Sequence, residues 1–387
     1  MAQKPIKCCI IRGGTSKGVY IERSELPLPG PERDRIILAL FGSPDKRQID
    51  GLGGADKLTS KTAIMGPPTR PDCDIDYDFG QVNTLLPRID WTSNCGNLSS
   101  GAALYAVHKG YAQPTEPFAD VAIHVVNTGN RLLARVPVAD GGPATEGEFK
   151  IGGVPGTGAK IELDFQDFAG CILKRGLLPT GSARDVFDVP GLGRLELSIV
   201  DMANFCVFVR ASDVGLDHTA SLEAVQADRA VLERMEAIRA VVALEFGLAT
   251  RENLEETMRV KLNPTLFILG TPRDYATVNG EPVEGESTDL FARCFNRWAF
   301  SKAYQTTGST GTAIASVIPG TIVSEQVRGG PPPEGKAREV RIGHPGGTMS
   351  VEAAISHEGG FKVERAVVGR TARLLMEGLG MSRAPTS

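Results

Sequence analysis

Two segments of the chain have the composition of helices that lack a polar face. One covers residues 98–108 and the other residues 312–318, and nearly every position in both is small or apolar. A helix that is apolar all round has to be enclosed by protein. The rest of the chain is rich in short β-branched runs separated by Gly, Pro and Asp, which is typical of strands joined by turns. We therefore expect an α+β protein in which strands surround one buried helix in each half.

Hydrophobic periodicity gives more specific predictions for individual elements. Helices are expected over Pro31–Phe41, which opens on Pro and is followed by Gly42, over the amphipathic segment Ala220–Phe246, and over Thr288–Trp298. Short apolar runs predict strands over Lys7–Ile11, Val19–Ile21, Thr62–Met65, Ile75–Val82, Val121–Val126, Leu132–Val138, Leu195–Val200, Cys206–Arg210, Thr265–Leu269, Val340–Ile342 and Lys362–Val368.

The length of the chain, 387 residues, indicates two or three domains at roughly 150 residues each. The stretch Gly176–Ser182 contains Gly and Pro and is the best candidate for a boundary. We predict an N-terminal domain over residues 1–180 and a C-terminal domain of similar construction over residues 181–369. Residues 370–387 are expected to pack back on the first domain.

Charge and hydropathy disfavour two classes of partner. The net charge is −4, so no basic excess is available to neutralise phosphates, and nucleic-acid binding is disfavoured. No apolar stretch approaches the ~20 residues that cross a bilayer, and the N-terminus lacks the apolar region of a signal peptide. We expect a cytoplasmic protein that binds neither nucleic acid nor membrane.

The cysteines, histidines and aspartates form no metal-binding pattern. The seven cysteines are scattered without a Cys-x-x-Cys pair, which argues against a disulfide framework and a zinc ribbon, and the five histidines are dispersed. Asp72, Asp74, Asp76 and Asp78 alternate as in a calcium loop but lack its Gly and its closing Glu. We expect no metal site, and we expect these carboxylates on one solvated face of a strand.

The first segment with chemistry suited to an anion is Arg12–Gly18. It offers Thr15, Ser16 and Lys17 as candidate donors on a Gly-rich backbone. The order Gly-x-x-x-x-Gly-Lys-Ser/Thr of a nucleotide P-loop is absent, and the segment precedes a strand. The alternative is an ordinary hairpin turn.

The second segment, residues 51–62, places Lys61 where a Gly-rich polar loop becomes the predicted strand Thr62–Met65. Partial burial at this point would favour the neutral, basic form of the amine. Lys61 is therefore a candidate base, and the alternative is a solvated lysine beside a strand.

The third segment, Ser93–Asn97, lies directly before the first buried helix. A thiol there meets the unsatisfied N–H groups and the positive dipole end of the helix, which favours the thiolate of Cys95. Asn94, Gly96 and Asn97 add donors. The alternative is that Cys95 is a small buried apolar residue.

The fourth segment, Thr306–Thr312, has the same relation to the second buried helix and offers Ser309, Thr310, Gly311 and Thr312. If the two halves pack face to face, both helix N-termini would point into one cleft and favour an anionic substrate. His344 lies in another Gly-rich segment, residues 341–350. Ligand binding and a structural role are both open for this histidine.

Together these motifs resemble the PrpF family. The resemblance extends over nearly the whole chain and rests on Arg12-Gly-Gly-Thr-Ser-Lys-Gly, Gly42-Ser-Pro-Asp, Arg47-Gln-Ile-Asp-Gly, Leu58-Thr-Ser-Lys, Asn94-Cys-Gly-Asn, Leu178-Pro-Thr-Gly, Ile318-Pro-Gly-Thr, Gly343-His-Pro-Gly-Gly and Arg370-Thr-Ala-Arg-Leu-Leu-Met-Glu-Gly. It implies a diaminopimelate epimerase-like fold of two related domains, each a sheet curled around a central helix, with the site between them.

The resemblance also implies the roles of particular residues. Asn94–Asn97 matches the first Cys-bearing helix entrance of the epimerases, whereas Ser309–Thr312 stands in place of the second. A two-thiol racemase is therefore disfavoured. In the PrpF family, the residues that match Lys61 and Cys95 are implicated in proton transfer.

The implied reaction is a 1,3-allylic proton shift that needs no cofactor. The substrate would be a small anionic polycarboxylate such as methylitaconate, methylaconitate, aconitate or oxalomesaconate. Lys61 would remove the proton, and Lys61 or Cys95 would return it. The N–H groups around Cys95–Asn97 and Ser309–Thr312 would hold carboxylates and the dienolate, with the side chains named above as further anchors.

Two alternative functions and the oligomeric state stay open at this point. One is a cofactor-independent epimerase that acts at a single carbon. Another is a non-catalytic accessory protein of an iron–sulfur dehydratase, although the thiols show no cluster-ligand spacing. The sequence is also compatible with either a monomer or a homo-oligomer.

Overall fold

The computed structural model of the chain describes residues 3–92, 94–333, 335–357 and 359–383. It divides into two compact units, one formed by Met1–Asp164 with Gly369–Ser387 and the other by Phe165–Val368. The boundary lies before the position predicted at residue 180, because the intervening segment bonds to the second unit. The Gly170 N–H donates to the Asp201 carbonyl at 2.7 Å, and the Asp201 N–H donates to the Leu177 carbonyl at 2.9 Å.

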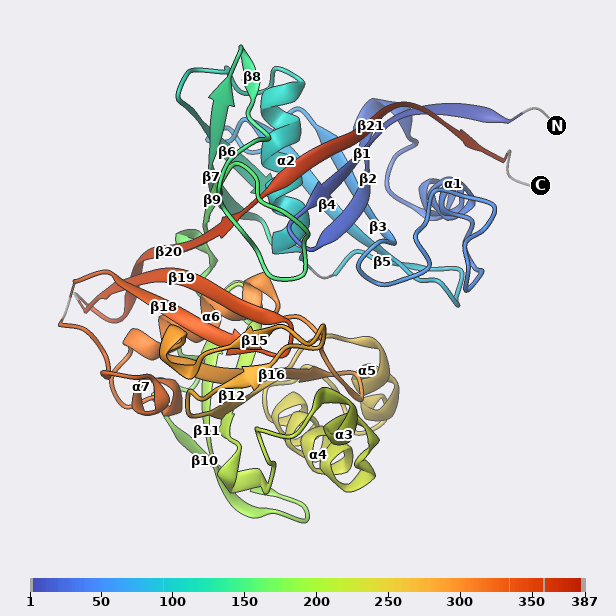
Figure 1. Ribbon diagram of the computed structural model, residues 1–387. Helices are drawn as coiled ribbons and strands as arrows, with labels where there is room; N and C mark the ends of the chain where they lie inside the picture. Colours follow the sequence, from blue (N-terminus) through green and yellow to red (C-terminus); the bar gives the residue numbers. More distant parts are fainter. Residues whose placement is uncertain (1–2, 93, 334, 358, 384–387) are drawn as a thin grey trace. The chain divides into compact units, whose positions relative to one another are not determined.

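The first unit is a set of strands around one buried helix, α2 (Figure 1). Its elements are β1 (Lys4–Gly13), β2 (Ser16–Glu22), η1 (Arg23–Glu25), α1 (Pro31–Phe41), β3 (Lys61–Gly66), β4 (Ile75–Val82), β5 (Ile89–Asp90), α2 (Gly96–His108), β6 (Phe118–Val125), β7 (Asn130–Ala139), β8 (Gly142–Pro143), β9 (Ile161–Asp164) and β21 (Ala372–Ser382).

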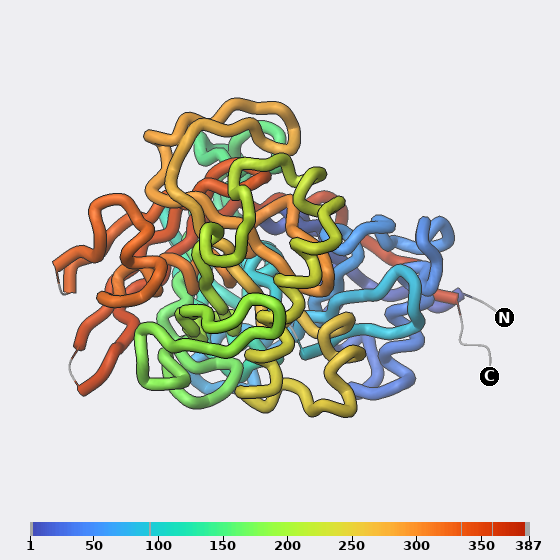
Figure 2. Tube along the Cα trace, turned by 90° about the horizontal axis from the view of Figure 1, so that it is seen from below, coloured from blue at the N-terminus to red at the C-terminus, as the bar shows by residue number. Residues whose placement is uncertain are grey.

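The sheet of the first unit is held together across the two ends of the chain. β1 pairs antiparallel with both β2 and β21, in a register that runs from Lys4 opposite Ser382 to Gly13 opposite Ala372. The described ends of these strands accordingly lie side by side in Figures 1 and 2. β2 pairs parallel with β3, β3 antiparallel with β4, and β4 parallel with β6. The last segment of the chain therefore belongs structurally to the first unit.

Alternation along β1 explains why both of its faces are covered. Cys8 packs in a core with Ile37 and Phe41 of α1, whereas α2 packs against β1 with residues that are almost all buried. The helix predicted over residues 98–108 is confirmed as α2. The predicted helix α1 is confirmed as well, with Gly42 in the left-handed conformation (φ 72°) that ends it.

The second unit repeats this plan around α6. Its elements are η2 (Gln166–Phe168), β10 (Asp185–Val189), β11 (Gly193–Asp201), β12 (Phe205–Arg210), η3 (Ser212–Val214), α3 (Leu222–Ala227), α4 (Arg229–Glu245), α5 (Leu254–Val260), β13 (Thr265–Gly270), β14 (Tyr275–Ala276), β15 (Pro282–Val283), η4 (Gly285–Ser287), β16 (Leu290–Asn296), β17 (Ala299–Phe300), α6 (Thr306–Val317), α7 (Ile322–Gln326), β18 (Arg338–His344), β19 (Gly347–Ser356) and β20 (Lys362–Arg370).

The sheet of the second unit lies between α6 and α4. α6 packs against β19, β18, β11 and β12, and all of its residues are buried. Met235, Ile238 and Val242 of α4 join a core with Ile199 and Ile268 of the strands. Each unit therefore buries an apolar helix on one face of its strands and an amphipathic helix on the other.

Three sequence predictions are wrong, and each error has an identifiable physical reason. The segment Thr288–Trp298 is not a helix but contains strand β16, which is buried at every position and pairs with β13 and β18. A strand that is buried on both faces does not show the alternation that would distinguish it from a helix. The segment Ala220–Phe246 is interrupted at Asp228, whose side chain accepts the Val231 N–H at 3.1 Å and caps α4.

The third correction concerns the four alternating aspartates. Asp76 is buried and is bonded by Arg23, His124 and Thr69. Although burial raises the pKa of this carboxyl, the hydrogen bonds from Thr69, His124 and Arg23 lower it overall. Asp78 binds Arg33 at 3.0 Å, and burial raises its pKa against the effect of Arg33. These two carboxylates are structural ion-pair partners rather than a solvated row.

The remaining predicted strands are confirmed in position. Within the described part of the chain, no helix is both long and apolar enough to cross a membrane.

Candidate active site

Cys95 occupies the N-cap of α2, with extended backbone angles (φ −133°, ψ 95°) and a side chain that is about nine-tenths buried. Its carbonyl accepts from the Ser99 N–H at 3.0 Å, the Ser99 hydroxyl at 3.1 Å and the Tyr77 hydroxyl at 3.2 Å. The first helical turn, Gly96–Leu98, directs its N–H groups out of the same end. The predicted helix entrance is present, with the thiol at its first position. Ser93, which the sequence placed in this segment, lies outside the described residues.

The β1–β2 hairpin lies directly against this helix start. A Cβ on Gly13 would come within 2.4 Å of the Asn97 carbonyl oxygen, and one on Gly14 within 2.2 Å of Asn97 Oδ1. Gly14 also has a positive φ of 53°. Glycine is favoured here both because the turn needs this left-handed conformation and because a side chain would collide with Asn97. Asn97 Nδ2 donates to the Thr15 hydroxyl at 3.1 Å. The first and third candidate segments are therefore brought together.

Two buried polar atoms in these segments have no hydrogen-bond partner among the described residues. Among the described residues, neither Ser16 Oγ nor Asn94 Nδ2 finds a hydrogen-bond partner, although both atoms are inaccessible to solvent. Ser16 is only 2% exposed. An unsatisfied buried donor costs about 1–3 kcal/mol, so a fold that keeps two of them near one helix start retains capacity for a ligand there.

Lys61 begins β3 and is only 7% exposed. It lies opposite Gln81 in the antiparallel pairing of β3 with β4. Its Nζ donates to Gln81 Oε1 at 2.7 Å and lies 5.0 Å from the centre of the Phe79 ring. The solvated alternative is excluded, and the amine is held by a neutral amide and an aromatic face.

One face of β4 connects the lysine to the cysteine. Tyr77, Phe79 and Gln81 alternate along the strand and share this face, which we call the inner face of β4. Tyr77 bonds the Cys95 carbonyl, while Phe79 and Gln81 contact the Lys61 amine. The opposite face carries Asp76 and Asp78, the structural ion-pair partners.

Gly18 provides a second connection between the two segments. A Cβ on Gly18 would lie 2.8 Å from Leu98 Cδ2 and 3.0 Å from the Lys61 carbonyl oxygen. The absence of a side chain there lets β2 lie between the first turn of α2 and the start of β3. Lys17, on the same strand, donates its N–H to the Leu58 carbonyl at 2.9 Å and is half-buried.

Arg370 is a further candidate site residue, which sequence reasoning did not single out. It is 4% exposed, and its Nε donates to Asn97 Oδ1 at 3.2 Å. Burial lowers the pKa of Arg370 to about 10, although the charge of Cys95 acts in the opposite direction. The neighbouring Thr371 carbonyl accepts from the Gly14 N–H and from Arg12. The motif that begins at Arg370 was recognisable in the sequence, but its proximity to Cys95 was not.

The fourth candidate segment differs from its prediction. Helix α6 begins at Thr306, so Ser309–Thr312 lies inside the helix rather than at its entrance. The Ser309 N–H donates to the Gln305 carbonyl. The hydroxyls of Ser309, Thr310 and Thr312 donate to carbonyls of the preceding turn, those of Thr306, Thr307 and Gly308 respectively. Gly311 is required by packing, because a Cβ would lie 2.4 Å from Cys206 Sγ. A substrate-binding role for these four residues stays a prediction that their hydrogen bonds do not support.

His344 is buried in the second unit, where Tyr275 and Tyr304 surround it. Its N–H donates to the Tyr275 hydroxyl at 3.1 Å, its Nδ1 accepts the Gly346 N–H at 3.1 Å, and its ring stacks on Tyr304 at 5.8 Å. These contacts favour the structural alternative for His344.

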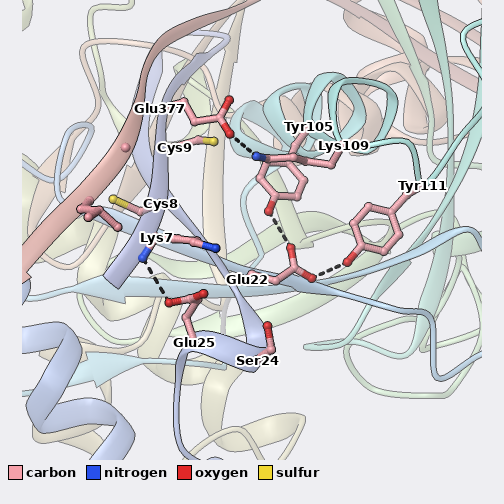
Figure 3. Close-up of a pocket in the computed structure, with 12 residues that line it drawn as sticks. Lys7, Cys8, Cys9, Glu22, Ser24, Glu25, Tyr105, Lys109, Tyr111 and Glu377 are labelled. Atoms are coloured by element: carbon pink, nitrogen blue, oxygen red, sulfur yellow. Dashed lines mark hydrogen bonds and ion pairs between the residues drawn. The ribbon is translucent and has the colours of Figure 1, made fainter. Parts of the chain in front are cut away.

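The pocket drawn in Figure 3 contains neither Lys61 nor Cys95. It has a volume of about 670 Å³ and lies near the opposite end of α2, since Tyr105 is about 15 Å along the helix from Cys95. Glu22 accepts from Tyr105 and Tyr111, and Lys109 pairs with Glu377. Because these groups satisfy one another, we do not assign the chemistry to this pocket.

Comparison with known proteins gives a consistent match along the chain. Residues 3–382 match the family model described as PrpF protein. The 3-methylitaconate isomerase of Eubacterium barkeri is 41% identical, covering 97% of each chain. The 2-methyl-aconitate isomerase of Shewanella oneidensis is 34% identical, covering 97% of this chain and 96% of the relative.

Solved structures agree with the predicted fold. A crystal structure of methylitaconate-delta-isomerase superimposes with a TM-score of 0.85 at 40% identity, covering 99% of this chain and 96% of the other. A hydroxyproline epimerase from Agrobacterium vitis shares 10% identity with a TM-score of 0.55, covering 98% and 94%. The second likeness concerns the fold alone. The α+β, epimerase-like fold predicted from the sequence is confirmed.

Proposed function

The chain belongs to the PrpF family and is an isomerase, and we propose that it catalyses a 1,3-allylic proton shift on a small unsaturated di- or tricarboxylate. The double bond migrates in this reaction, or rotates while it is delocalised. Lys61 and Cys95 are the proposed proton carriers.

The chemistry defines what the site has to supply. An allylic C–H conjugated through C=C to a carboxylate is a weak acid, and its conjugate base spreads charge onto the carboxylate oxygens. A positioned base lowers the barrier to removing the proton. Donors fixed around the carboxylate stabilise the dienolate. An amine, a thiol and a set of N–H and O–H donors meet these needs.

The proton and electron balance follows from these groups. Neutral Lys61 takes the allylic proton and becomes an ammonium, while the C–H electron pair enters the dienolate. Either the Lys61 ammonium or the Cys95 thiol protonates the far carbon. If Cys95 donates, the thiolate regains its proton from the Lys61 ammonium, directly or through solvent, so that both the thiol and the neutral amine are restored before the next turnover.

The observation that carries this proposal is the inner face of β4. Its Tyr77 bonds the backbone of Cys95, and its Phe79 and Gln81 hold the Lys61 amine. Tyr77 and Gln81 are about 13 Å apart along the strand, so the backbone of Cys95 and the Lys61 amine contact the same face of one strand.

We assign carboxylate binding to donors at the start of α2. Ser16 and Asn94 each hold an unpartnered buried donor among the described residues, and Arg370 brings a buried positive charge next to Asn97. Helix N–H groups add partial positive charge at the same end. Thr15 and Lys17 are further candidates on the hairpin.

The test is a screen of unsaturated polycarboxylates followed by NMR in deuterated water. The panel contains methylitaconate, methylaconitate, aconitate and oxalomesaconate. We expect at least one to isomerise, with deuterium at the carbon that gains the proton. Failure of the wild-type protein to isomerise any of them would contradict the proposal. Deuterium exchange at one carbon without movement of the double bond would indicate an epimerase instead.

We also propose that the protein works in the reducing environment of the cytoplasm. All seven cysteines lie within the described residues, and each is a free, buried thiol. Disulfides persist in oxidising compartments and are rare in the cytosol. Fractionation of the native cell tests this location, and recovery of the protein outside the cytoplasm would contradict it.

A further inference from the structure

We propose that Gln81 is a positioning residue for Lys61, and that its amide oxygen aims the amine at the substrate without adding a charge. This inference rests on the proposed function, in which Lys61 is the base. The relevant contact is the hydrogen bond of 2.7 Å from Lys61 Nζ to Gln81 Oε1.

The orientation of the Gln81 amide is fixed by its other contacts. Gln81 Nε2 donates to the Ser60 carbonyl at 2.9 Å and to the Lys57 carbonyl at 3.2 Å. Carbonyl oxygens only accept hydrogen bonds, so the nitrogen must face them and the oxygen must face Lys61. The direct pairing of Lys61 with Gln81 across β3 and β4 holds both backbones.

The loop that carries these two carbonyls is itself tied down. Ser60 is fully buried, and its hydroxyl donates to Gln48 Oε1. Gln48 also accepts the Ala55 N–H at 2.8 Å and donates to the Ser43 hydroxyl at 2.8 Å. The support of the amine therefore continues from Gln81 through Ser60 to a buried glutamine.

A neutral acceptor suits a base better than a carboxylate does. A neutral amine has two N–H bonds and one lone pair, and a hydrogen bond from one N–H to Gln81 restricts the direction of the lone pair. Phe79 beneath the amine limits it further. A carboxylate at the same place would form an ion pair with the ammonium and oppose its deprotonation.

Apart from Lys17, the charged groups on the elements packed against β3 have partners other than Lys61. These elements are β2, β4, η1 and α2. Their ionisable residues pair as follows: Glu22 with Tyr105 and Tyr111, Asp76 with Arg23 and His124, Asp78 with Arg33, Glu25 with the Lys7 N–H, and His108 with Glu377. The half-buried Lys17 of β2 lies next to Gly18, the strand partner of Lys61. A carboxylate introduced at position 81 would therefore add a negative charge beside the Lys61 amine without replacing an existing ion pair of that amine.

Two variants of Gln81 test the proposal. Gln81→Met removes the acceptor at similar length, and we expect kcat to fall about tenfold or more with KM changed less than about twofold, since only the aim of the base is lost. Gln81→Glu keeps the oxygen but adds charge, and we expect the acid limb of the kcat/KM profile to move up by about one pH unit or more.

The matched control is Gln226 in the second unit. Its side chain also joins two backbone groups, accepting the Phe300 N–H at 2.8 Å and donating to the Trp298 carbonyl at 3.3 Å. Gln226→Met and Gln226→Glu measure how much stability and activity the protein loses when a glutamine that bonds two backbone groups is replaced away from Lys61. Their kcat and pH profile should match those of the wild type. Gln81 variants that are folded and kinetically identical to these controls overturn the proposal.

A second measurement separates this proposal from the proposed function and needs no substrate. The rate at which Lys61 is acylated at a fixed pH, followed by mass spectrometry, reports its neutral fraction. In Gln81→Glu we expect Lys61 to react about tenfold more slowly than in the wild type, with exposed Lys160 unchanged. An unchanged rate at Lys61 overturns the positioning role. A slowed rate in a protein that isomerises nothing supports the contact while refuting the proposed reaction.

Discussion

The starts of the two buried helices, α2 and α6, are similar in sequence composition and different in chemistry. At α2 the N-cap is Cys95, and nearby Ser16 and Asn94 keep donors without partners among the described residues. At α6 the hydroxyls of Ser309, Thr310 and Thr312 all return to carbonyls of their own helix. Small polar residues are thus buried near both helix starts, but among the described residues the three α6 hydroxyls are satisfied within their helix, whereas Ser16 and Asn94 keep unpartnered donors.

The difference shows what distinguishes a binding site from a close-packed helix. The hydroxyl of a Ser or Thr inside a helix can donate a hydrogen bond to the backbone carbonyl three or four residues earlier. A buried hydroxyl that has no such carbonyl must bind water or ligand or remain unsatisfied at a cost. Ser16 lies on a strand beside a hairpin and has no helix to bond. The chemistry is therefore expected to depend on the α2 region far more than on Ser309–Thr312.

The largest expected effect is loss of Lys61, the proposed base of β3 that contacts the inner face of β4. Lys61→Ala should lower kcat by about 10³-fold, in the range attributed to a positioned general base. Steady-state kinetics on the substrate found in the screen measure this loss. A Lys61→Ala protein that keeps its kcat would show that the α2 region is not where the proton is taken.

The variant Cys95→Ser tests whether the thiol returns the proton to the substrate. If Cys95 returns the proton, we expect a large loss of kcat, because a serine hydroxyl is a much weaker acid than a thiol. If Lys61 works alone, the loss is modest. Thermal unfolding of both variants checks that α2 keeps its N-cap, which serine also provides.

The next effect in size concerns the buried charge at α2. Arg370→Gln should raise KM about tenfold to a hundredfold, because a hydrogen bond to a charged group contributes about 1.5–3 kcal/mol. Arg370→Lys keeps the charge and should recover part of this loss. An unchanged KM in Arg370→Gln would remove the residue from the substrate site.

A pair of serine variants tests the comparison most directly. Ser309→Ala should cost about 1 kcal/mol of unfolding free energy, because its bond to the Thr306 carbonyl is lost, and should leave kcat/KM within about twofold. Ser16→Ala loses no protein hydrogen bond among the described residues, so its stability should be unchanged while KM rises. Denaturant titration and kinetics together measure both. The reverse result would mean that the two helix starts have been assigned the wrong roles.

The smallest effect is expected at the far end of α2. Glu377 bonds Lys109 and His108, and these hydrogen bonds lower its pKa to about 2. A carboxylate with a depressed pKa stabilises the fold above its unfolded value of about 4.3, and this contribution is lost as the pH falls toward 2. Because the pair is exposed, Glu377→Gln should cost less than about 1 kcal/mol at pH 7. Unfolding curves of wild type and variant should converge near pH 2, and a constant difference across this range would contradict the ion pair.

Local sequence signals were sufficient for much of the fold and part of the site. Pro31 and Gly42 frame α1, the apolar run after Asn97 forms α2, and Cys95 is at its entrance. Such features depend on neighbours within a few residues, so they can be read without tertiary information. Boundaries are less well predicted, because the segment Thr306–Thr312, predicted to precede the second buried helix, is already part of α6.

Contacts across the fold explain what sequence reasoning missed. β16 is a strand although its sequence predicts a helix, because it is buried at every position and so shows no alternation. Its neighbours, the paired strands β13 and β18 and the helix α4, come from distant parts of the chain. Gln81 and Phe79 acquire a role only through the pairing of β4 with β3. No local pattern distinguishes a glutamine that holds a lysine from one on a solvated strand.

The sequence by itself determined that two apolar helices must be enclosed, that a thiol lies at the start of one, and that a lysine begins a strand. Tertiary structure decided which groups surround them. Arg370 meets Asn97 across more than two-thirds of the chain length, and Tyr77 meets Cys95 through a strand that runs beside the helix. The physical reason is that periodicity and capping are short-range effects, whereas burial, charge and hydrogen-bond satisfaction at a site depend on segments that the folded chain alone brings together.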